Sequence, residues 1–265
     1  MILLDINKIV DYCKKNYPQK SINRIANELS IDRHKLSKIM KDAGIEIIRY
    51  RRKYALNETF FETIDSEEKA YWLGFIAADG CVCRRTLSIN LNIKDKAHLE
   101  KLIAILNSET QIKEVPGTGY GEGTMIAHLE INSKKLIDDL AKYGIVPRKS
   151  LILKPPQIEP SLERHWIRGY FDGDGSIIPE LKNGNAQLSF CGTKEVIRWI
   201  EYKLTNENSH SLYSRWGDAT KNSYQFSLGG KDSILKYINY IYDNSTIYLD
   251  RKYKKVLELK SRLEK

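Results

Sequence analysis

The sequence has little cysteine and no long apolar run. Four of its 265 residues are cysteine: Cys13 and Cys191 stand alone, and Cys81-x-Cys83 lacks the second pair that a zinc site needs. We therefore expect reduced thiols rather than a disulfide framework. The longest apolar stretch, 70–78, is far shorter than the roughly 20 residues that span a bilayer, and the start of the chain lacks the apolar core of a signal peptide. We expect no membrane segment, and an intracellular protein in the cytoplasm of a prokaryotic or phage-infected host.

Positive charge, by contrast, is plentiful. The 43 lysines and arginines outnumber the 34 aspartates and glutamates, which gives a net charge of +9 and a pI near 9.2. The excess is densest in the first quarter of the chain. Such a balance favours an anionic partner such as nucleic acid. The length also allows two domains, or one large pseudo-symmetric domain with a small one.

Residues 1–48 are predicted to form three helices with the pattern of a DNA-binding helix-turn-helix. The third helix, over 32–41, begins at the predicted N-cap Asp32 and turns Leu36, Ile39 and Met40 inward. In a helix-turn-helix the second helix of the motif enters the major groove. A small helical bundle with an ordinary solvated basic face is the alternative. A basic linker, 49–64, would lie near phosphates. The candidate DNA contacts in this part are Arg33, His34, Lys35, Ser37, Lys38, Arg51, Arg52 and Lys53.

A short segment occurs twice in the rest of the chain. Leu73-Gly-Phe-Ile-Ala-Ala-Asp-Gly80 is echoed by Ile167-Arg-Gly-Tyr-Phe-Asp-Gly-Asp-Gly175. Both copies are predicted to be helices that end at an aspartate, Asp79 and Asp174. We expect the glycine after each aspartate to take the left-handed conformation that ends many helices.

Small residues predict how these two helices meet. Gly74 with Ala78, and Gly169 with Gly173, lie four apart and therefore share one helix face. Glycine inside a helix costs roughly 0.5–1 kcal/mol against alanine, so its presence suggests that another backbone comes close. We expect the two helices to pack on each other and to bring their final aspartates side by side.

The two segments resemble the paired motif of the LAGLIDADG homing endonucleases, over roughly residues 65–255. The resemblance implies an α+β fold: a pseudo-twofold pair of repeats, 65–158 and 159–265, forming a saddle-shaped antiparallel sheet, with a small all-α helix-turn-helix domain in front. It implies that Asp79 and Asp174 bind Mg²⁺, one for each DNA strand, and that the carbonyls of Gly80 and Gly175 assist. Mn²⁺ or Ca²⁺ could occupy the same site. Carboxylate oxygens suit such hard ions. The family cuts across the minor groove and leaves short 3′ overhangs.

The residues after each motif alternate in polarity, as on a half-buried sheet. We expect a strand from Arg84 to Lys94, and the order of elements recurs after a proline-rich join at 155–160. The resemblance implies that the polar faces read base edges and that a lysine after the first long strand of each repeat is catalytic. Candidate base contacts are Arg84, Ser88, Asn90, Asn92, Asn185, Gln187, Ser189 and Arg215. Candidate catalytic lysines are Lys94 and Lys194, and further phosphate contacts are Arg148, Lys149, Arg251 and Lys252.

These observations predict a monomeric, site-specific double-strand DNA endonuclease. Because the two halves differ in sequence, its target should be long and non-palindromic. Two alternatives stay open. A maturase of the same fold would bind intron RNA and assist splicing, and a transcription regulator of the same fold would bind DNA without cutting it. The two aspartates argue against the regulator, because a pure binder has no need of two acids beside DNA phosphate.

Overall fold

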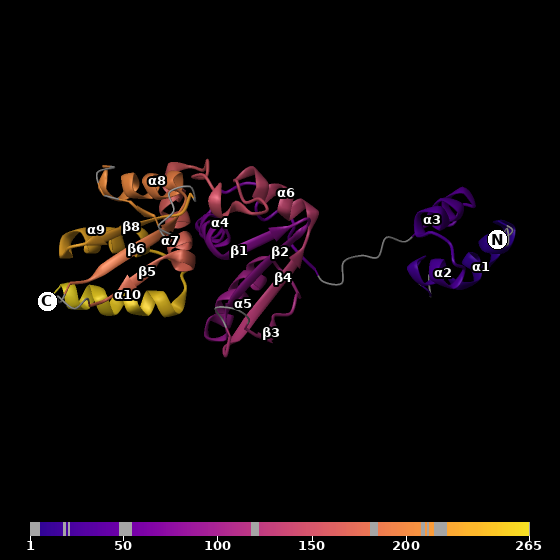
Figure 1. The fold of residues 1–265 in the computed structure, drawn as a ribbon, viewed down its shortest axis with the longest axis horizontal. Helices are drawn as coiled ribbons and strands as arrows, with labels where there is room; N and C mark the ends of the chain where they lie inside the picture. Colours follow the sequence, from indigo (N-terminus) through magenta and orange to yellow (C-terminus); the bar gives the residue numbers. More distant parts are fainter. Residues whose placement is uncertain are drawn as a thin grey trace. The chain divides into compact units, whose positions relative to one another are not determined.

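The computed structural model describes residues 6–17, 20, 22–47, 55–117, 122–180, 185–207, 210, 212–214 and 222–264. The chain divides into two compact units, residues 1–53 and 54–265, and each is described by itself (Figure 1). The predicted DNA contacts Arg51, Arg52, Lys53 and Arg215 lie outside the described residues. Within those residues, no helix is long and apolar enough to cross a bilayer.

The first unit contains a small three-helix core. Its helices are α1 (Ile6–Asn16), α2 (Ile22–Glu28) and α3 (Arg33–Asp42). The predicted N-cap of α3 is confirmed, because Asp32 Oδ1 accepts hydrogen bonds from the backbone N–H groups of His34 at 2.9 Å and Lys35 at 3.0 Å. Leu36 and Met40 are buried as expected. The apolar face of α3 therefore holds it in the core and leaves its basic face outward.

The second unit is built from two halves with the same order of strands. The first half contains α4 (Glu67–Asp79), β1 (Gly80–Cys83), β2 (Thr86–Asn92), the 3₁₀ helix η1 (Ile93–Asp95), α5 (Lys96–Ile105), β3 (Lys113–Pro116), β4 (Met125–Asn132) and α6 (Lys134–Lys142). Its strands form an antiparallel sheet in the order β1-β2-β4-β3.

The second half repeats this arrangement. After η3 (Lys149–Leu151), a 3₁₀ helix that ends the first half, it contains the 3₁₀ helix η4 (Pro160–Leu162), then α7 (Glu163–Asp174), β5 (Ser176–Ile178), β6 (Gln187–Gly192), α8 (Lys194–Thr205), β7 (Tyr213–Ser214), β8 (Tyr224–Gly229), α9 (Lys231–Tyr242) and α10 (Asp250–Leu263). Its sheet has the order β5-β6-β8-β7, position for position that of the first half. The internal duplication is thus visible in the topology, but the strands form two separate four-stranded sheets rather than a single one.

The strand predicted from Arg84 to Lys94 is wrong at both ends. Arg84 has φ 54° and lies in the turn between β1 and β2, and Lys94 lies in η1. The hairpin could not be predicted from the residue types at its turn, because its left-handed residue is an arginine rather than glycine or asparagine. The alternation itself is confirmed, since Leu87 and Ile89 are buried while Asn90 is exposed.

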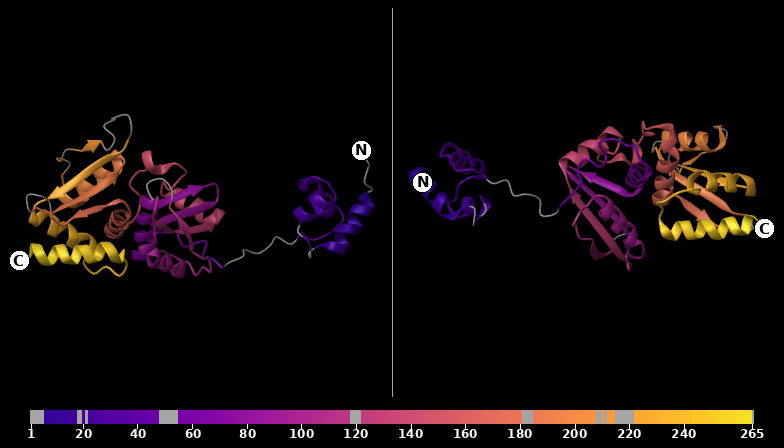
Figure 2. Two further views of the ribbon diagram at one scale, coloured as in Figure 1. Left: turned by 60° about the horizontal axis from the view of Figure 1, so that its bottom comes forward. Right: turned by 180° about the vertical axis from the view of Figure 1, so that it is seen from behind.

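One apolar core runs through both halves of the second unit. Helices α4 and α7 make the most extensive contact between any two elements, and Figure 1 shows them side by side with one sheet on either side. Figures 1 and 2 both show α10 starting beside these central helices and running away from the first half. The ends of α4 and α7 therefore lie where the two halves meet.

Candidate functional site

Helices α4 and α7 touch backbone to backbone through glycine. A Cβ added at Gly74 would lie 2.0 Å from the carbonyl oxygen of Trp166, and a Cβ at Gly169 would lie 1.9 Å from that of Tyr71. Neither position can hold a side chain without moving the partner helix. A Cβ at Gly173 would meet Ala78 Cβ at 2.4 Å. The predicted close packing of the two helices is therefore confirmed.

This packing brings the two final aspartates together. Asp79 is the last residue of α4 and is half-buried, and Asp174 is the last residue of α7 and is exposed. Burial and the negative charge of Asp174 raise the pKa of Asp79 to about 7, while the charges of Lys252 and Lys149 oppose that rise. Two carboxylates and two lysines thus form one electrostatic cluster, the acid–lysine cluster, where the halves meet.

Both helices end without the left-handed glycine that we predicted. Gly80 has φ −73° and Gly175 has φ −76°, so both are extended and lead directly into β1 and β5. Glycine is needed there for space, since a Cβ would lie 2.6 Å from the carbonyl oxygen of Ile76 in one copy and 2.5 Å from that of Phe171 in the other. The chain turns too sharply from helix to strand for a side chain at this point.

Two buried lysines bind the carbonyl groups at the helix ends. Lys252 Nζ donates to the carbonyl oxygens of Phe171 at 2.6 Å, Gly173 at 3.2 Å and Gly175 at 2.6 Å. In the other half, Lys149 Nζ donates to the carbonyl oxygen of Ala78 at 3.2 Å. A cation at this place satisfies free carbonyls and opposes the negative end of the helix dipole.

These lysines correct the sequence-based interpretation. Both were predicted as further phosphate contacts, but Lys149 and Lys252 are only 5% and 7% exposed, and the Nζ atom of each donates to backbone carbonyls. Burial lowers the pKa of Lys252 to about 8, and burial also lowers the pKa of Lys149. The neighbouring aspartates oppose both shifts. The lysines therefore belong to the acid–lysine cluster.

The other predicted basic residues lie elsewhere. Lys94 and Lys194 are exposed, each at the start of the helical segment that follows a central strand, and neither is among the principal charges acting on Asp79. Their catalytic role stays a prediction. Arg148 is exposed and left-handed, with φ 60°. Arg251 instead forms a two-pronged ion pair with Asp95 of the first half, at 3.1 Å from Nε to Oδ1 and 2.8 Å from Nη2 to Oδ2.

A polar network behind the acids was missed by the sequence analysis. Asp172 is 1% exposed and accepts hydrogen bonds from Tyr71 Oη at 2.7 Å, Tyr242 Oη at 2.5 Å and the backbone N–H of Leu249 at 2.7 Å. Tyr71 comes from the first half, and Leu249 is the N-cap of α10. Asp172 therefore fixes the start of the helix that carries Lys252.

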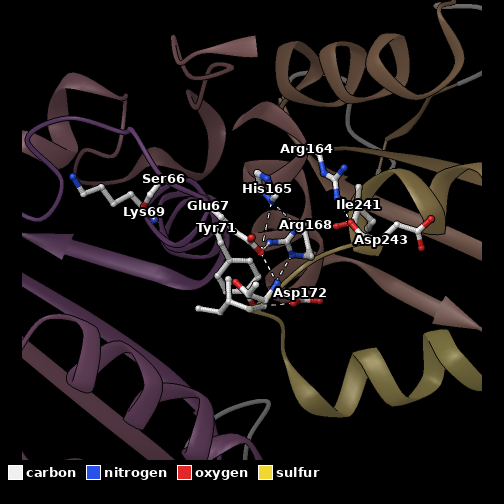
Figure 3. A network of polar contacts seen from close by, with 12 residues as sticks. Ser66, Glu67, Lys69, Tyr71, Arg164, His165, Arg168, Asp172, Ile241 and Asp243 are labelled. Carbon is white, nitrogen blue, oxygen red and sulfur yellow. Dashed lines mark hydrogen bonds and ion pairs between the residues drawn. The ribbon is translucent and has the colours of Figure 1, made fainter. Parts of the chain in front are cut away.

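Arg168 extends this network, as Figure 3 shows. It is fully buried, and its Nη2 donates to Glu67 Oε1 of α4 at 2.6 Å. Its other nitrogens donate to His165 Nδ1 and to the carbonyl oxygens of Ile241 and Ile247. A charged residue at a place where the first copy of the repeated segment has leucine was the signal that the sequence offered.

The two sheets each turn one face away from their helices. In the first sheet Ser88, Asn90 and Asn92 of β2 lie on that open face, as predicted. Strand β4 adds three residues that we had not predicted: His128, Glu130 and Asn132. In the second sheet Asn185 is exposed and Gln187 is half-buried on the open face, whereas Ser189 is only 7% exposed between its neighbours Ser176 and Ser227. Ser189 is therefore a poor candidate for a base contact.

Among the described residues of the first unit, the predicted contacts all lie on one helix, α3. Arg33, His34, Lys35 and Lys38 are exposed there, and Ser37 is half-buried. This exposure fits a solvated basic face as well as a DNA-binding one, so their role stays a prediction.

The acid–lysine cluster fits a hard divalent cation in part. Among the described residues, no group of three or more His, Cys, Asp and Glu side chains forms a complete metal site. Two carboxylates remain, and Mg²⁺ is commonly bound through one or two carboxylates plus phosphate oxygens and water. Burial, and after it the charge of Asp174, raise the pKa of Asp79, so both disfavour its charged form, and a bound cation would favour that form. The Gly175 carbonyl, predicted to assist, already accepts from Lys252.

Comparison with known proteins identifies the fold. A scan against models of known protein families finds no match. Among solved structures, the meganuclease I-SmaMI bound to uncleaveable DNA matches with a TM-score of 0.50 and 13% identity, over 75% of this chain and 91% of that chain. The I-LtrWI LAGLIDADG homing endonuclease bound to target DNA matches with a TM-score of 0.50 and 12% identity, over 78% and 91%. The chain therefore has the α+β fold of the LAGLIDADG endonucleases, with an additional helical unit in front.

Proposed function

We propose that the protein is a site-specific double-strand DNA endonuclease that hydrolyses phosphodiester bonds with Mg²⁺. One observation supports this above all: two aspartates end two helices that pack backbone to backbone, and two buried lysines lie beside them. The shared fold adds support, because the matching I-SmaMI and I-LtrWI structures are DNA complexes. The net charge of +9 suits the same partner.

Asp79 and Asp174 would hold the cation, with phosphate oxygens and water completing its shell. When bound at a phosphodiester, such a cation lowers the pKa of an attacking water and stabilises the leaving oxygen. The chain's own contribution is to hold the two carboxylates close together, each serving one strand. Lys149 and Lys252 keep positive charge beside them and hold the helix ends in place. Lys94 and Lys194 keep their predicted role as catalytic lysines, but they are less favoured than Lys149 and Lys252, which lie beside the aspartates.

The DNA would lie across the open faces of the two sheets, which together would form the predicted saddle, with its minor groove over the acid–lysine cluster. Polar side chains on those faces would read base edges in the major groove on either side. The two halves carry different residues on these faces, so a single chain would recognise a long asymmetric target without a second copy. The basic face of α3 would add contacts outside the main target.

A non-cutting regulator of the same fold is the simplest rival. It would have to tolerate two carboxylates beside DNA phosphate, where like charges repel. Such a regulator would also have no need to bring the ends of α4 and α7 together beside the DNA phosphates, as the close glycine packing does. An RNA maturase would share the fold and charge, and only experiment separates it.

The test begins by selecting a target from a randomised double-stranded DNA library with the wild-type chain. We expect the selected duplex to be cut on both strands with Mg²⁺ and to stay intact with EDTA. The double variant Asp79→Asn/Asp174→Asn should bind the duplex without cutting it. Specific binding with no cutting by the wild-type chain would favour the regulator. Tighter binding to a structured intron RNA than to any duplex would favour the maturase.

A further inference from the structure

The open face of the first sheet carries an acidic residue in its second central strand. Strand β4 turns Ala127, Leu129 and Ile131 into the core, and the residues between them face the other way. Glu130 is one of these, opposite Ser88 of β2, and its side chain is 49% exposed. A carboxylate therefore stands on the surface that the proposed function assigns to DNA.

Glu130 has little local compensation. Among the described residues its one ion-pair neighbour is His128, whose Nε2 lies 3.7 Å from Glu130 Oε2. The other ring nitrogen, Nδ1, lies 2.6 Å from Asn90 Oδ1 and donates to it, since that oxygen can only accept. A neutral His128 therefore presents an acceptor, rather than a donor, toward Glu130. The carboxylate keeps unfilled capacity to accept hydrogen bonds.

The surroundings of Glu130 form an open hollow. A hollow of about 830 Å³ lies between the β1–β2 turn and the start of α6, and Glu130 is in its wall. Arg84 and Arg85 stand at the turn and Lys134 on the far side, where Lys134 pairs with Asp138. Thr86 and Asn132 line it between them. Arginines at the rim suit phosphates, and the acid inside the hollow does not.

The second sheet has no such group. Its open face, as far as the described residues of β5, β6 and β8 show it, carries Ser176, Ile178, Gln187, Ser189, Cys191, Gln225, Ser227 and Gly229. None of these is charged. The two halves of the protein therefore differ in charge at their reading faces.

A carboxylate facing DNA weakens binding to every sequence that offers it no donor. In the major groove the donors are the amino groups of cytosine and adenine, whereas guanine and thymine present only acceptors on their O6, N7 and O4 atoms. Desolvating Glu130 against those acceptors would leave it unpaired and repelled by phosphate. Glutamate is a common partner of the cytosine N4 amino group.

We infer that Glu130 is a specificity-determining residue that selects cytosine in the half-site covered by the first sheet. The inference rests on the proposed DNA-binding function and deepens it. Replacing that cytosine should weaken binding by the wild-type chain roughly tenfold or more, the usual effect of a wrong base at a direct contact.

The experiment compares three chains in the same selection from a randomised duplex library, without Mg²⁺. These are the wild type, Glu130→Gln and the control Glu114→Gln. Glu114 lies on β3 of the same sheet, but it is opposite Ala127 and so points to the other face, where it pairs with Lys96. Both substitutions remove one exposed negative charge, on opposite faces of the same sheet, and Glu114→Gln also releases Lys96 from its ion pair.

We expect the wild type and Glu114→Gln to enrich the same site, with cytosine fixed at one position of one half-site. Glu130→Gln should lose that single preference, keep the others and bind random duplex more tightly, because a charge that repels phosphate is gone. An unchanged profile in Glu130→Gln, or one affinity change shared by all sequences, would overturn this inference alone. Failure of the wild type to enrich any sequence would overturn the proposed function and this inference with it.

Discussion

Replacing Gly169 by alanine should separate the two central helices. The new Cβ would lie 1.9 Å from the carbonyl oxygen of Tyr71 and 2.9 Å from the backbone nitrogen of Phe75, so the helices must move apart by roughly 1 Å or more. Alanine alone would favour an unobstructed helix by about 0.5–1 kcal/mol. Overpacking a tight interface costs about 1–3 kcal/mol, occasionally more, and a gap of about 1 Å forfeits up to half of each dispersion contact along it.

We therefore expect Gly169→Ala to lower the free energy of unfolding by about 3 kcal/mol, measured by urea unfolding. For a unit of this size that corresponds to a fall in Tm of roughly 6–12 °C. Because the aspartates would separate as well, cleavage should fall more than DNA binding. Gly229→Ala is the control for stability alone: Gly229 ends β8, and the nearest atom to an added Cβ, the Ala186 carbonyl oxygen, is 4.0 Å away. Equal or higher stability of Gly169→Ala would refute the close helix contact.

Three further predictions concern charged and titratable groups. Burial lowers the pKa of His98 to about 3 and the pKa of His165 to about 4, whereas in the unfolded chain both histidines take up a proton near pH 6.5. Stability should therefore be full above pH 6.5 and should fall toward pH 5 by up to about 1.4 kcal/mol per pH unit for each histidine. His98→Gln and His165→Gln should each flatten the dependence of stability on pH in urea unfolding, and an unchanged slope would contradict this. Arg168→Met leaves Glu67 without its buried partner and should cost about 3 kcal/mol in the same assay, a result that near-wild-type stability would exclude. Lys252→Met should slow single-turnover cleavage about a hundredfold with little change in DNA binding; parallel losses of both would point to a merely structural lysine.

The sequence predicted the parts of the site that depend on repetition and spacing. Two copies of a segment with small residues four apart were enough to pair the helices and to bring Asp79 and Asp174 together. Alternating polarity was enough to find the buried face of β2, and Asp32 was found as a cap because its capping bonds are local.

Contacts between residues far apart in the sequence could not be predicted. Arg148-Lys149 and Arg251-Lys252 read alike as exposed basic pairs, because the carbonyl groups that bury the two lysines belong to distant helices. Gly80 was expected to be left-handed from its place after a helix, but its real constraint is the sharp entry into β1.

Strand β4 carries part of the open face of the first sheet. Its polar face was not identified from the sequence, because only the pairing of β4 with β2 shows that His128 and Glu130 share a surface with Asn90.

Strand-resolved cleavage by single aspartate variants tests the central claim most directly. The selected duplex, labelled differently on its two strands, would be incubated with Mg²⁺ and with Asp79→Asn or Asp174→Asn. If each acid serves one strand, each variant should nick a single strand, and the two variants should nick opposite ones. Cutting of both strands at the wild-type rate by either variant would show that the paired acids do not perform the chemistry.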